Sequence, residues 1–453
     1  MTASEIEPGF VAHVTAEDLR DAWPVLDPSE QVEAFRALPQ IQAEEFFLEL
    51  SALDRSHVVL GLPTIEQRWW LRALPPDDVA DVIQEAPVDD RSRLLALLDE
   101  PTRKEINALL AYSEDEAGGL MNPRYARLRP DMRVDEAISY LRRQTRERVE
   151  SIYYAYVLGE GLHLLGIVSF RQLMMARGDA LVRDVMEKEL VTVHEEMDQE
   201  AVSRLFATAN LMAIPVVDAQ GRMKGVVTAD DIVDVVREEA TEDIQKIGGT
   251  AALGAPYLQV GFAEMIKARA GWLTALFLGQ TLTISAMGHF QSELDRAKVL
   301  SLFVPLILSS GGNCGSQAST LVIRAIALGE VRLRDWWRVF TRELAAGLTL
   351  GALLGALGLV RIVIWQHVFD HEHDPSVGYY GAHYLLIAGT VTLSVVCVAT
   401  WGTLAGSLLP FMLKRVGLDP AVASAPLVAT LVDVTGVLIY FTTAATLLTG
   451  TLL

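Results

Sequence analysis

The chain has 453 residues, 51% of them hydrophobic, and a formal net charge of −20. The first 250 residues hold 26 Lys or Arg and 47 Asp or Glu, whereas the rest of the chain holds 12 and 11. An acidic half without a basic stripe excludes a nucleic-acid binder, and Cys314 and Cys397 are too few cysteines for a disulfide-stabilised secreted domain. The first 25 residues lack the continuous apolar stretch of a secretory signal, so we expect the acidic half in the cytoplasm.

Residues 1–116 are predicted to form an acidic, all-α domain of short amphipathic helices. Apolar residues recur there at helical spacing, as in Val79, Val82 and Ile83. Proline and aspartate stand where helices should begin, at residues 75–78 and again at residues 87–89. Because the two segments resemble each other, we expect helical repeats that stack into a small superhelical domain.

The segment from residue 117 to residue 238 repeats itself, and strands alternate with helices in each copy. Residues 165–169 of the first copy correspond to residues 224–228 of the second. This pattern resembles a tandem pair of CBS modules, residues 117–178 and 179–238. The resemblance implies that the two modules form one α/β disc, and such pairs often bind adenine nucleotides.

The CBS resemblance also implies where a nucleotide such as ATP would bind. It places Thr228 and Asp231 near a ribose and phosphates. The first copy has Ser169 at the matching position, but Gln172 replaces the aspartate. We therefore expect at most one intact nucleotide site, and a purely structural role for this turn remains the alternative.

Residues 239–267 are predicted to form a connecting helix and linker, and residues 268–453 a membrane domain of five helices. A membrane helix needs roughly 20 mostly apolar residues. The second half offers five long stretches that are free of charged residues, apart from Asp433 in the last. These stretches are residues 270–291, 299–323, 344–360, 375–413 and 420–453.

Basic residues gather on the loops that five alternating helices would place on one side of the membrane, whereas the other two loops are neutral or acidic. Because positively charged loops face the cytoplasm, we expect a multi-pass protein of the cytoplasmic (inner) membrane, in contact with its lipids. Its N-terminal domains would lie inside and its C-terminus outside. The basic residues are Lys267, Arg269, Arg324, Arg332, Arg334, Arg338, Arg342, Lys414 and Arg415.

Asp433 interrupts the last predicted membrane helix. A carboxylate at this depth is costly, so such residues usually face a polar cavity and mark a transport pathway. Several residues on its helical face are small, which leaves room beside the carboxylate. The alternative is an Asp that bonds another helix as a packing contact. The candidate pore-lining neighbours are Pro426, Ala429, Thr430 and Gly436.

The second predicted membrane helix carries three glycines and many hydroxyl or amide side chains within residues 309–320. Such residues line a water-filled cavity, or they form a seam of small residues where helices pack closely. Both roles can hold together. The candidate pore-lining residues here are Gly311, Gly312, Asn313 and Gln317.

A lone carboxylate in a wide polar pore suits Mg²⁺, which dehydrates reluctantly and keeps several waters when one or two carboxylates hold it. One Asp433 per chain, doubled across a twofold axis, would provide such a site. Zn²⁺ or Cu⁺ would need His or Cys ligands on the pore face, and the predicted helices show no such cluster. An outer loop rich in His and acidic residues is interpreted as a solvated segment that can concentrate cations. That loop contains His367, Asp370, His371, Glu372, His373 and Asp374.

From about residue 20 to its end, the chain resembles the MgtE family of magnesium transporters or channels. The order of an acidic helical domain, paired CBS modules, a connecting helix and five membrane helices matches that family. Its specific motifs are Pro305 with residues 311–317, and residues 426–436; residues 117–121 and 240–244 add to the resemblance. The resemblance implies a homodimer whose second and fifth membrane helices line a central, channel-like pore, with paired Asp433 side chains holding hydrated Mg²⁺.

The resemblance further implies that intracellular Mg²⁺ closes the pore by binding to the acidic domains. Facing carboxylates repel each other unless a cation neutralises them, so Mg²⁺ would shift the population towards a closed state. Asn210 and His57 stand where an acid is expected from the family pattern, which predicts a sensor that is weaker or that uses fewer ions. The candidate sensor residues are Asp77, Asp78, Asp198, Glu200, Asp231, Asp234, Glu239, Glu242, Asp243 and Asp419.

Two rival functions remain open from the sequence. The chain could transport other divalent cations such as Co²⁺ or Mn²⁺, or it could be a non-transporting membrane sensor of Mg²⁺ or a nucleotide. An enzyme is set aside because the sequence shows no nucleophile–base pair, no phosphate-binding glycine loop and no catalytic metal spacing. Ion selectivity, coupling to another ion and ATP binding do not follow from the sequence.

Overall fold

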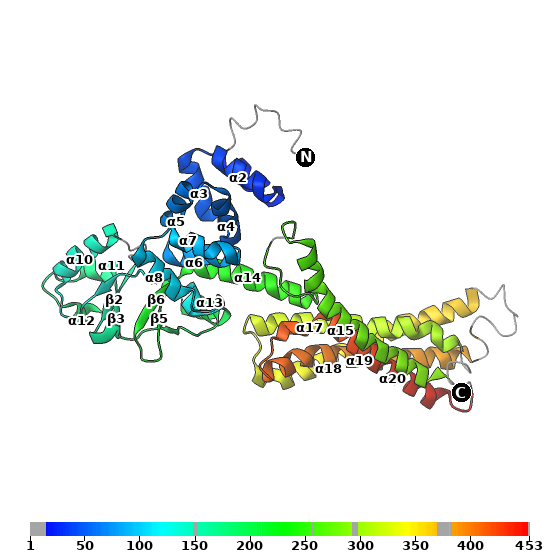
Figure 1. The fold of residues 1–453 in the computed structure, drawn as a ribbon. Helices are drawn as coiled ribbons and strands as arrows, with labels where there is room; N and C mark the ends of the chain where they lie inside the picture. The colour runs from blue at the N-terminus through cyan, green and yellow to red at the C-terminus, as the bar shows by residue number, and fades with distance from the viewer. Residues whose placement is uncertain are drawn as a thin grey trace. The chain divides into compact units, whose positions relative to one another are not determined.

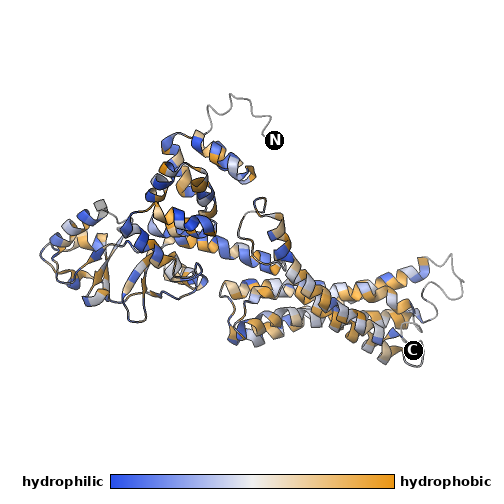
Figure 2. Ribbon diagram, in the orientation of Figure 1, coloured by the Kyte–Doolittle hydropathy of each residue, from blue (hydrophilic) through white to orange (hydrophobic). Residues whose placement is uncertain are grey.

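The computed structural model describes residues 15–147, 153–209, 211–255, 257–291, 298–368, 380 and 383–451 (Figure 1). The chain divides into two compact units. The first comprises Met1–Glu239 with Ala255–Gln259, and the second comprises Ala240–Gly254 with Val260–Leu453. Coloured by hydropathy, the long helices of the second unit are mostly hydrophobic, whereas helices of the first unit alternate between hydrophobic and hydrophilic residues (Figure 2).

Eight short helices begin the described part of the first unit, as the sequence predicts. Their starts use ordinary helix signals: the Asp27 carboxylate accepts hydrogen bonds from the backbone N–H groups of Ser29 and Glu30, and Pro76 occupies the first turn of α6. Helices α2, α4, α6 and α8 pack in succession, which gives the predicted stacked arrangement. The eight helices are α1 (Ala16–Ala22), α2 (Pro28–Ala37), α3 (Gln40–Glu49), α4 (Ala52–Gly61), α5 (Thr64–Ala73), α6 (Pro76–Glu85), α7 (Val88–Ala96) and α8 (Glu100–Leu109).

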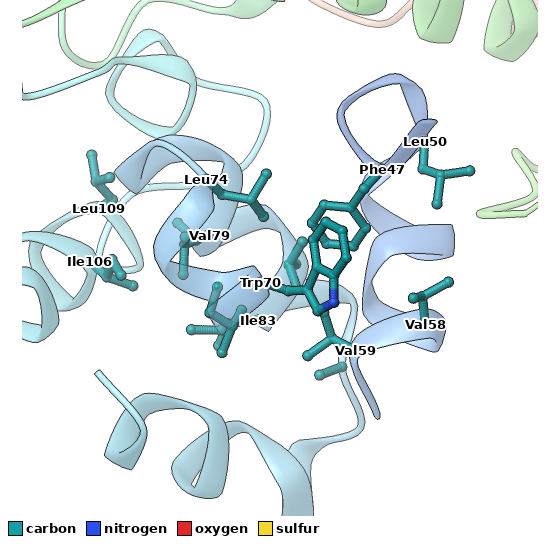
Figure 3. Close-up of a cluster of buried hydrophobic side chains, with 14 of the residues drawn as sticks. Phe47, Leu50, Val58, Val59, Trp70, Leu74, Val79, Ile83, Ile106 and Leu109 are labelled. Carbon is teal, nitrogen blue, oxygen red and sulfur yellow. The ribbon is translucent and has the colours of Figure 1, made fainter. Parts of the chain in front are cut away.

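One apolar core holds these helices together. Phe47 on α3 packs against Trp70 on α5, with ring centroids 4.6 Å apart. Val58, Val59 and Ile83 are fully buried around this pair (Figure 3). Burying side chains of this size contributes about 1.5–3 kcal/mol each, so the core fixes the position of α6, which carries several acidic residues.

The two predicted modules share one topology. In each three-stranded sheet the first strand is parallel to the second, and the second is antiparallel to the third. Both second strands shift register near their ends, at Val157/Leu158 and at Val216/Val217. The strands are β1 (Arg127–Leu128), β2 (Tyr154–Leu158) and β3 (Leu164–Ser169), then β4 (Val193–His194), β5 (Ala213–Val217) and β6 (Met223–Thr228). Their helices are α9 (Ala117–Leu120), α10 (Val134–Glu147), α11 (Phe170–Met175), α12 (Val182–Val185), α13 (Gln199–Ala209) and α14 (Ala229–Ile247).

Five helices of the second unit are long and apolar enough to cross a membrane, which confirms the predicted architecture within the described residues. The third is longer than predicted and includes Arg361, whose guanidinium carbon lies 4.7 Å from the Trp365 ring centroid near the helix end. Residues 375–379, where the fourth span was predicted to start, lie outside the described residues. The helices are α15 (Phe262–His289), α17 (Val304–Ala327), α18 (Trp336–Val368), α19 (Tyr384–Arg415) and α20 (Ala425–Leu448).

Glycines allow three of these helices to approach closely. A Cβ added at Gly402 of α19 would overlap the carbonyl oxygen of Gly311 on α17, and one at Gly406 would overlap that of Gly315. On its other side α19 meets Gly351 of α18, where an added Cβ would lie 2.8 Å from the backbone of α19. The small residues of α17 therefore do form a packing seam, one of the two roles expected for them.

Candidate functional site

Asp433 lies on α20, about 12 Å along the axis from the start of that helix. Its side chain is half-buried. Gln280 of α15 donates a hydrogen bond from Nε2 to Oδ2 of Asp433 over 3.1 Å. Gln280 did not stand out in the sequence, because it carries no charge and only charged residues were considered in this span. An amide in the middle of an otherwise apolar span was the available signal.

The predicted neighbours of Asp433 lie on two sides of α20. Ala429 faces Gly312 of α17, where an added Cβ would lie 3.6 Å away, and Gly436 is buried against α17 and α19. Thr430 faces α15 and donates its hydroxyl hydrogen to the carbonyl oxygen of Pro426 over 2.9 Å. Gly312 and Gly436 thus lie in helix contacts within one chain, as Gly311 does, rather than on an open face.

Asn313 and Gln317, in contrast, are exposed on α17. Together with Ser309, which accepts a hydrogen bond from Asn313 Nδ2 over 3.4 Å, they form a polar stripe at four-residue spacing. Lipid does not satisfy polar side chains at this depth, so such a stripe requires water or a protein partner. The stripe is the part of α17 that fits a pore wall.

Asp419 caps the start of the short 3-10 helix η7 (Pro420–Val422), which precedes α20. Its Oδ2 lies 2.7 Å from the ammonium of Lys246 on α14, and Lys246 also lies 2.5 Å from Glu242. Burial alone would lower the pKa of Lys246, but hydrogen bonds to Asp419 and Glu242 raise it. The structure therefore brings two predicted sensor residues together through an ammonium group that the sequence analysis did not consider.

In the first unit, carboxylates of α6 lie near the start of α14. Burial first, and then the charges of Asp78, Asp231, Glu114 and Glu238, raise the pKa of Asp81 well above its usual value. Burial raises the pKa of Asp231 to about 7, although hydrogen bonds from the Thr228 residue beside it oppose this. Asp81 was missed, although it follows the two predicted acids of α6 at helical spacing.

Three predicted sensor acids of this region have different surroundings. Asp78 lies 2.7 Å from the guanidinium of Arg55, whose side chain is 11% exposed. Asp77 is buried at 8% exposure. Asp234 is exposed, and its carboxylate lies 3.8 Å from Arg237.

Among the other sensor candidates, Asp198 and Glu200 make local contacts, whereas Glu239 bonds a residue 40 positions away. Asp198 caps α13 by accepting hydrogen bonds from the backbone N–H groups of Glu200 and Ala201, and Glu200 pairs with Arg204 over 3.0 Å. Glu239 accepts a hydrogen bond from Gln199 Nε2 over 2.8 Å.

Asp243, His57 and Asn210 are the remaining positions that stood out in the sequence. Asp243 lies on α14 one residue after Glu242. His57 has a buried Nδ1 without a hydrogen-bond partner within the described structure. Asn210 lies outside the described residues.

A cavity of about 1160 Å³ in the first unit is lined by α4, α6, both CBS modules and the start of α14. Thr228 and Asp231 lie on its wall, where the Thr228 hydroxyl donates to Asp231 Oδ2 over 2.6 Å. Ser169 and Gln172 form the same helix-capping pair in the first module, so this contact has a structural role in both copies. The sequence analysis missed the aromatic and basic part of the wall, which includes Tyr154, Phe170, Arg171 and Arg124.

No group of three His, Cys, Asp or Glu side chains within the described residues could hold a metal ion by direct ligation. Of the predicted outer cluster, His367 contacts the backbone oxygen of Val363 over 2.8 Å through a ring nitrogen. Residues 370–374 of that cluster lie outside the described part.

Comparison with known proteins gives consistent matches along the chain. The family model of the divalent cation transporter MgtE matches residues 304–443, that of the MgtE intracellular N domain residues 14–115, and that of the CBS domain residues 117–179 and 182–238. The chain is 39% identical to the magnesium transporter MgtE of Thermus thermophilus over 95% of this chain and 93% of that one. The chain is also 30% identical to the magnesium transporter MgtE of Bacillus subtilis, over 94% of this chain and 92% of that one. Among solved structures, the cytosolic domain of the Mg²⁺ channel MgtE in complex with ATP is 38% identical, has a TM-score of 0.46 and covers 50% of this chain and 92% of that chain.

Proposed function

This chain belongs to the MgtE family and transports Mg²⁺, and we propose that it does so as a homodimer in which Asp433 of each subunit holds the hydrated ion in a channel-like pore. The chain is a transporter and not an enzyme. The single observation that carries the pore site is the half-buried carboxylate of Asp433 at membrane depth. A carboxylate placed there has a functional role far more often than a structural one.

The chemistry of Mg²⁺ supports this site. Mg²⁺ usually keeps several waters and is bound through one or two carboxylates. One Asp433 from each of two subunits provides that number, and the described residues offer no direct three-ligand group that would strip the waters. The exposed polar stripe of Ser309, Asn313 and Gln317 on α17 supplies oxygen and nitrogen groups for the water around the ion.

For the orientation we propose that the first unit lies in the cytoplasm, that the C-terminus lies outside, and that the membrane is the cytoplasmic one. The support is the distribution of basic residues, which gather at the ends of the helices that would face the cytoplasm. In the opposite orientation, these basic residues would lie on the outer side of the membrane.

We propose, in addition, that cytoplasmic Mg²⁺ closes the pore through the acidic groups of both units. The support is the crowding of Asp78, Asp81 and Asp231: the charges of Asp78 and Asp231 raise the pKa of Asp81, and the charge of Asp78 raises the pKa of Asp231. A divalent cation relieves this repulsion and so stabilises the arrangement that brings the carboxylates together. Helix α14 carries Asp231 in the first unit and continues into the second, which offers a continuous element between sensor and pore.

A second function is supported by the cavity of the first unit, for which we propose an adenine nucleotide such as ATP. Its volume of about 1160 Å³ is slightly above the usual range for small-molecule sites, which ends at about 1,000 Å³. Tyr154 and Phe170 can stack on a base, and Arg171 can pair with phosphates. Binding of labelled ATP by the purified chain, lost in Arg171→Ala, tests this; equal binding by the variant would contradict it.

The transport site is tested by Mg²⁺ uptake into liposomes that contain the purified full chain and a Mg²⁺-sensitive dye. We expect uptake by the wild type and its loss in Asp433→Ala, while Asp335→Ala, in the residue just before α18, retains it. Uptake that survives the Asp433 substitution would show that the ion passes elsewhere. Uptake of Co²⁺ or Mn²⁺ in preference to Mg²⁺ would favour the broader cation transporter, and no uptake of any divalent ion would favour a membrane sensor.

A further inference from the structure

Helix α15 carries one amide side chain, Gln280, within its membrane-spanning length. Its neighbours Phe277, Leu278 and Leu282 are large, apolar and exposed, as expected for a helix in contact with lipid or protein. An amide at that depth is unfavourable unless its polar atoms are bonded. Gln280 therefore needs a partner, and the sequence of α15 offers no structural reason for an amide at this position.

The partner is the proposed pore carboxylate. An ionised carboxylate can only accept hydrogen bonds, so the NH₂ group of Gln280 faces Asp433 and donates to Oδ2 over 3.1 Å. Within the described residues, no other side chain donates a hydrogen bond to Asp433. Gly279 lets α15 come close at this level, because a Cβ there would already lie 3.1 Å from Thr430 on α20.

The bond leaves two oxygens free of this contact: Oδ1 of Asp433 and Oε1 of Gln280. Both side chains are only half-buried. A groove of about 580 Å³ along α15 is lined by Gln280 and by Thr430 of α20, so the Gln280 side of the pair borders open space. Two adjacent oxygen acceptors at an accessible position can both receive hydrogen bonds from water molecules.

We propose that Gln280 is a positioning residue for the transported cation, an inference that rests on the proposed role of Asp433. The charge-assisted bond from Nε2 holds the carboxylate in one orientation. Oδ1 of Asp433 and Oε1 of Gln280 then accept hydrogen bonds from waters that Mg²⁺ retains. Ca²⁺ sheds water more readily and accepts irregular direct ligation, so a carboxylate held by Gln280 favours hydrated Mg²⁺ over Ca²⁺.

The test compares uptake kinetics of the full chain in liposomes for wild type, Gln280→Met and Thr281→Val. Met has a similar length but neither donates nor accepts as an amide does. Thr281 is the matched control, because it is adjacent and exposed and its hydroxyl bonds the Leu278 carbonyl of its own helix over 2.6 Å. For Gln280→Met we expect the KM for Mg²⁺ to rise about tenfold with a maximal rate within about twofold, and the preference for Mg²⁺ over Ca²⁺ to fall. Thr281→Val should match the wild type.

A purely structural bond makes a different prediction. If Gln280→Met lowers the melting temperature but leaves both KM and the Mg²⁺/Ca²⁺ preference unchanged, Gln280 only joins two helices and the proposal is wrong. Should that variant not fold, Gln280→Glu keeps the length and adds a second carboxylate. It should then bind Ca²⁺ directly and lose the preference for Mg²⁺, and an unchanged preference would overturn the proposal.

The outcome for Asp433→Ala separates this inference from the proposed function. Suppose that uptake is lost in Asp433→Ala, while the folded Gln280 variants keep the wild-type KM and the wild-type preference for Mg²⁺ over Ca²⁺. That result overturns only the role of Gln280. Uptake that persists in Asp433→Ala overturns the pore site and the role of Gln280 with it.

Discussion

Asp231 offers a quantitative test of the acidic interior of the first unit. Burial raises the pKa of its carboxyl from 3.8 to about 7, against hydrogen bonds from Thr228 that lower it. Because the folded-state pKa lies above the unfolded-state value, the folded protein binds more protons between about pH 4 and pH 7. Below the unfolded-state pKa the buried carboxyl is protonated, and its full contribution to the free energy of unfolding is present. This contribution is lost as the pH rises through about 7, where the buried carboxyl must ionise. The rise from 3.8 to about 7 corresponds to about 4 kcal/mol.

The substitution Asp231→Asn keeps the shape of the side chain and removes its charge. It weakens the capping contact with Thr228, which costs about 1 kcal/mol. Above pH 7 we therefore expect Asp231→Asn to stabilise the first unit by about 2–3 kcal/mol, which raises its melting temperature by about 5–10 °C. Below about pH 4 the gain should disappear, because the wild-type carboxyl is then protonated in both states.

The assay is thermal unfolding of the full chain in detergent at several values between about pH 4 and 8. Asp230→Asn is the control for loss of a neighbouring charge, because Asp230 is adjacent and exposed and its charge is only a minor cause of the raised pKa of Asp231. The wild type and this control should lose stability as the pH rises, whereas Asp231→Asn should lose less. Saturating Mg²⁺ should reduce the loss in the wild type, because the cation neutralises the carboxylate. Parallel pH curves for wild type and Asp231→Asn would refute the reasoning.

Three further predictions address gating and packing. Removal of residues 1–115 should raise Mg²⁺ flux at high internal Mg²⁺ in liposomes, and unchanged flux would count against gating by that domain. Lys246→Met leaves Asp419 without its ammonium partner at 2.7 Å. The Mg²⁺ concentration that protects α14 from proteolysis should therefore be severalfold lower than for the wild type. An unchanged Mg²⁺ concentration would show that Mg²⁺ does not replace the ammonium. The side chain of Gly402→Val would overlap the backbone of Gly311, so the substitution should lower the free energy of unfolding by more than about 3 kcal/mol. The effect should be seen as a lower melting temperature or as loss of monodisperse protein in detergent. Wild-type behaviour of the variant would mean that α17 and α19 separate easily.

The sequence predicted those features that depend on composition and local spacing. Five apolar stretches gave the five membrane helices, because each must satisfy its backbone within one segment. The internal repeat gave two modules, and the structure repeats even the register shifts of Val157/Leu158 and Val216/Val217. Asp433 was identified because a charge in an apolar helix is visible without any knowledge of its neighbours.

The sequence did not predict which residues meet across the fold. Gln280 and Asp433 are 153 residues apart, and Lys246 and Asp419 are 173 apart. No local pattern joins such pairs, because their contact depends on how complete helices pack. Asp198 shows the opposite case: its capping contacts at the start of α13 are local, and the helix-start signal was available in the sequence.

The sensor candidates fall into two physical groups, and this division predicts how Mg²⁺ acts on them. Asp78 and Asp419 already have a basic partner at 2.7 Å, from Arg55 and Lys246 respectively. Asp81, in contrast, has its pKa raised by burial and by neighbouring negative charges. Mg²⁺ gains most where a carboxylate has no basic partner. A raised pKa means that a proton competes with Mg²⁺, so carboxylates of the second kind should respond at the lowest Mg²⁺ concentration once the pH is high enough to ionise them. Those with a basic partner need the cation to displace or share that partner, and they should respond only at higher concentration.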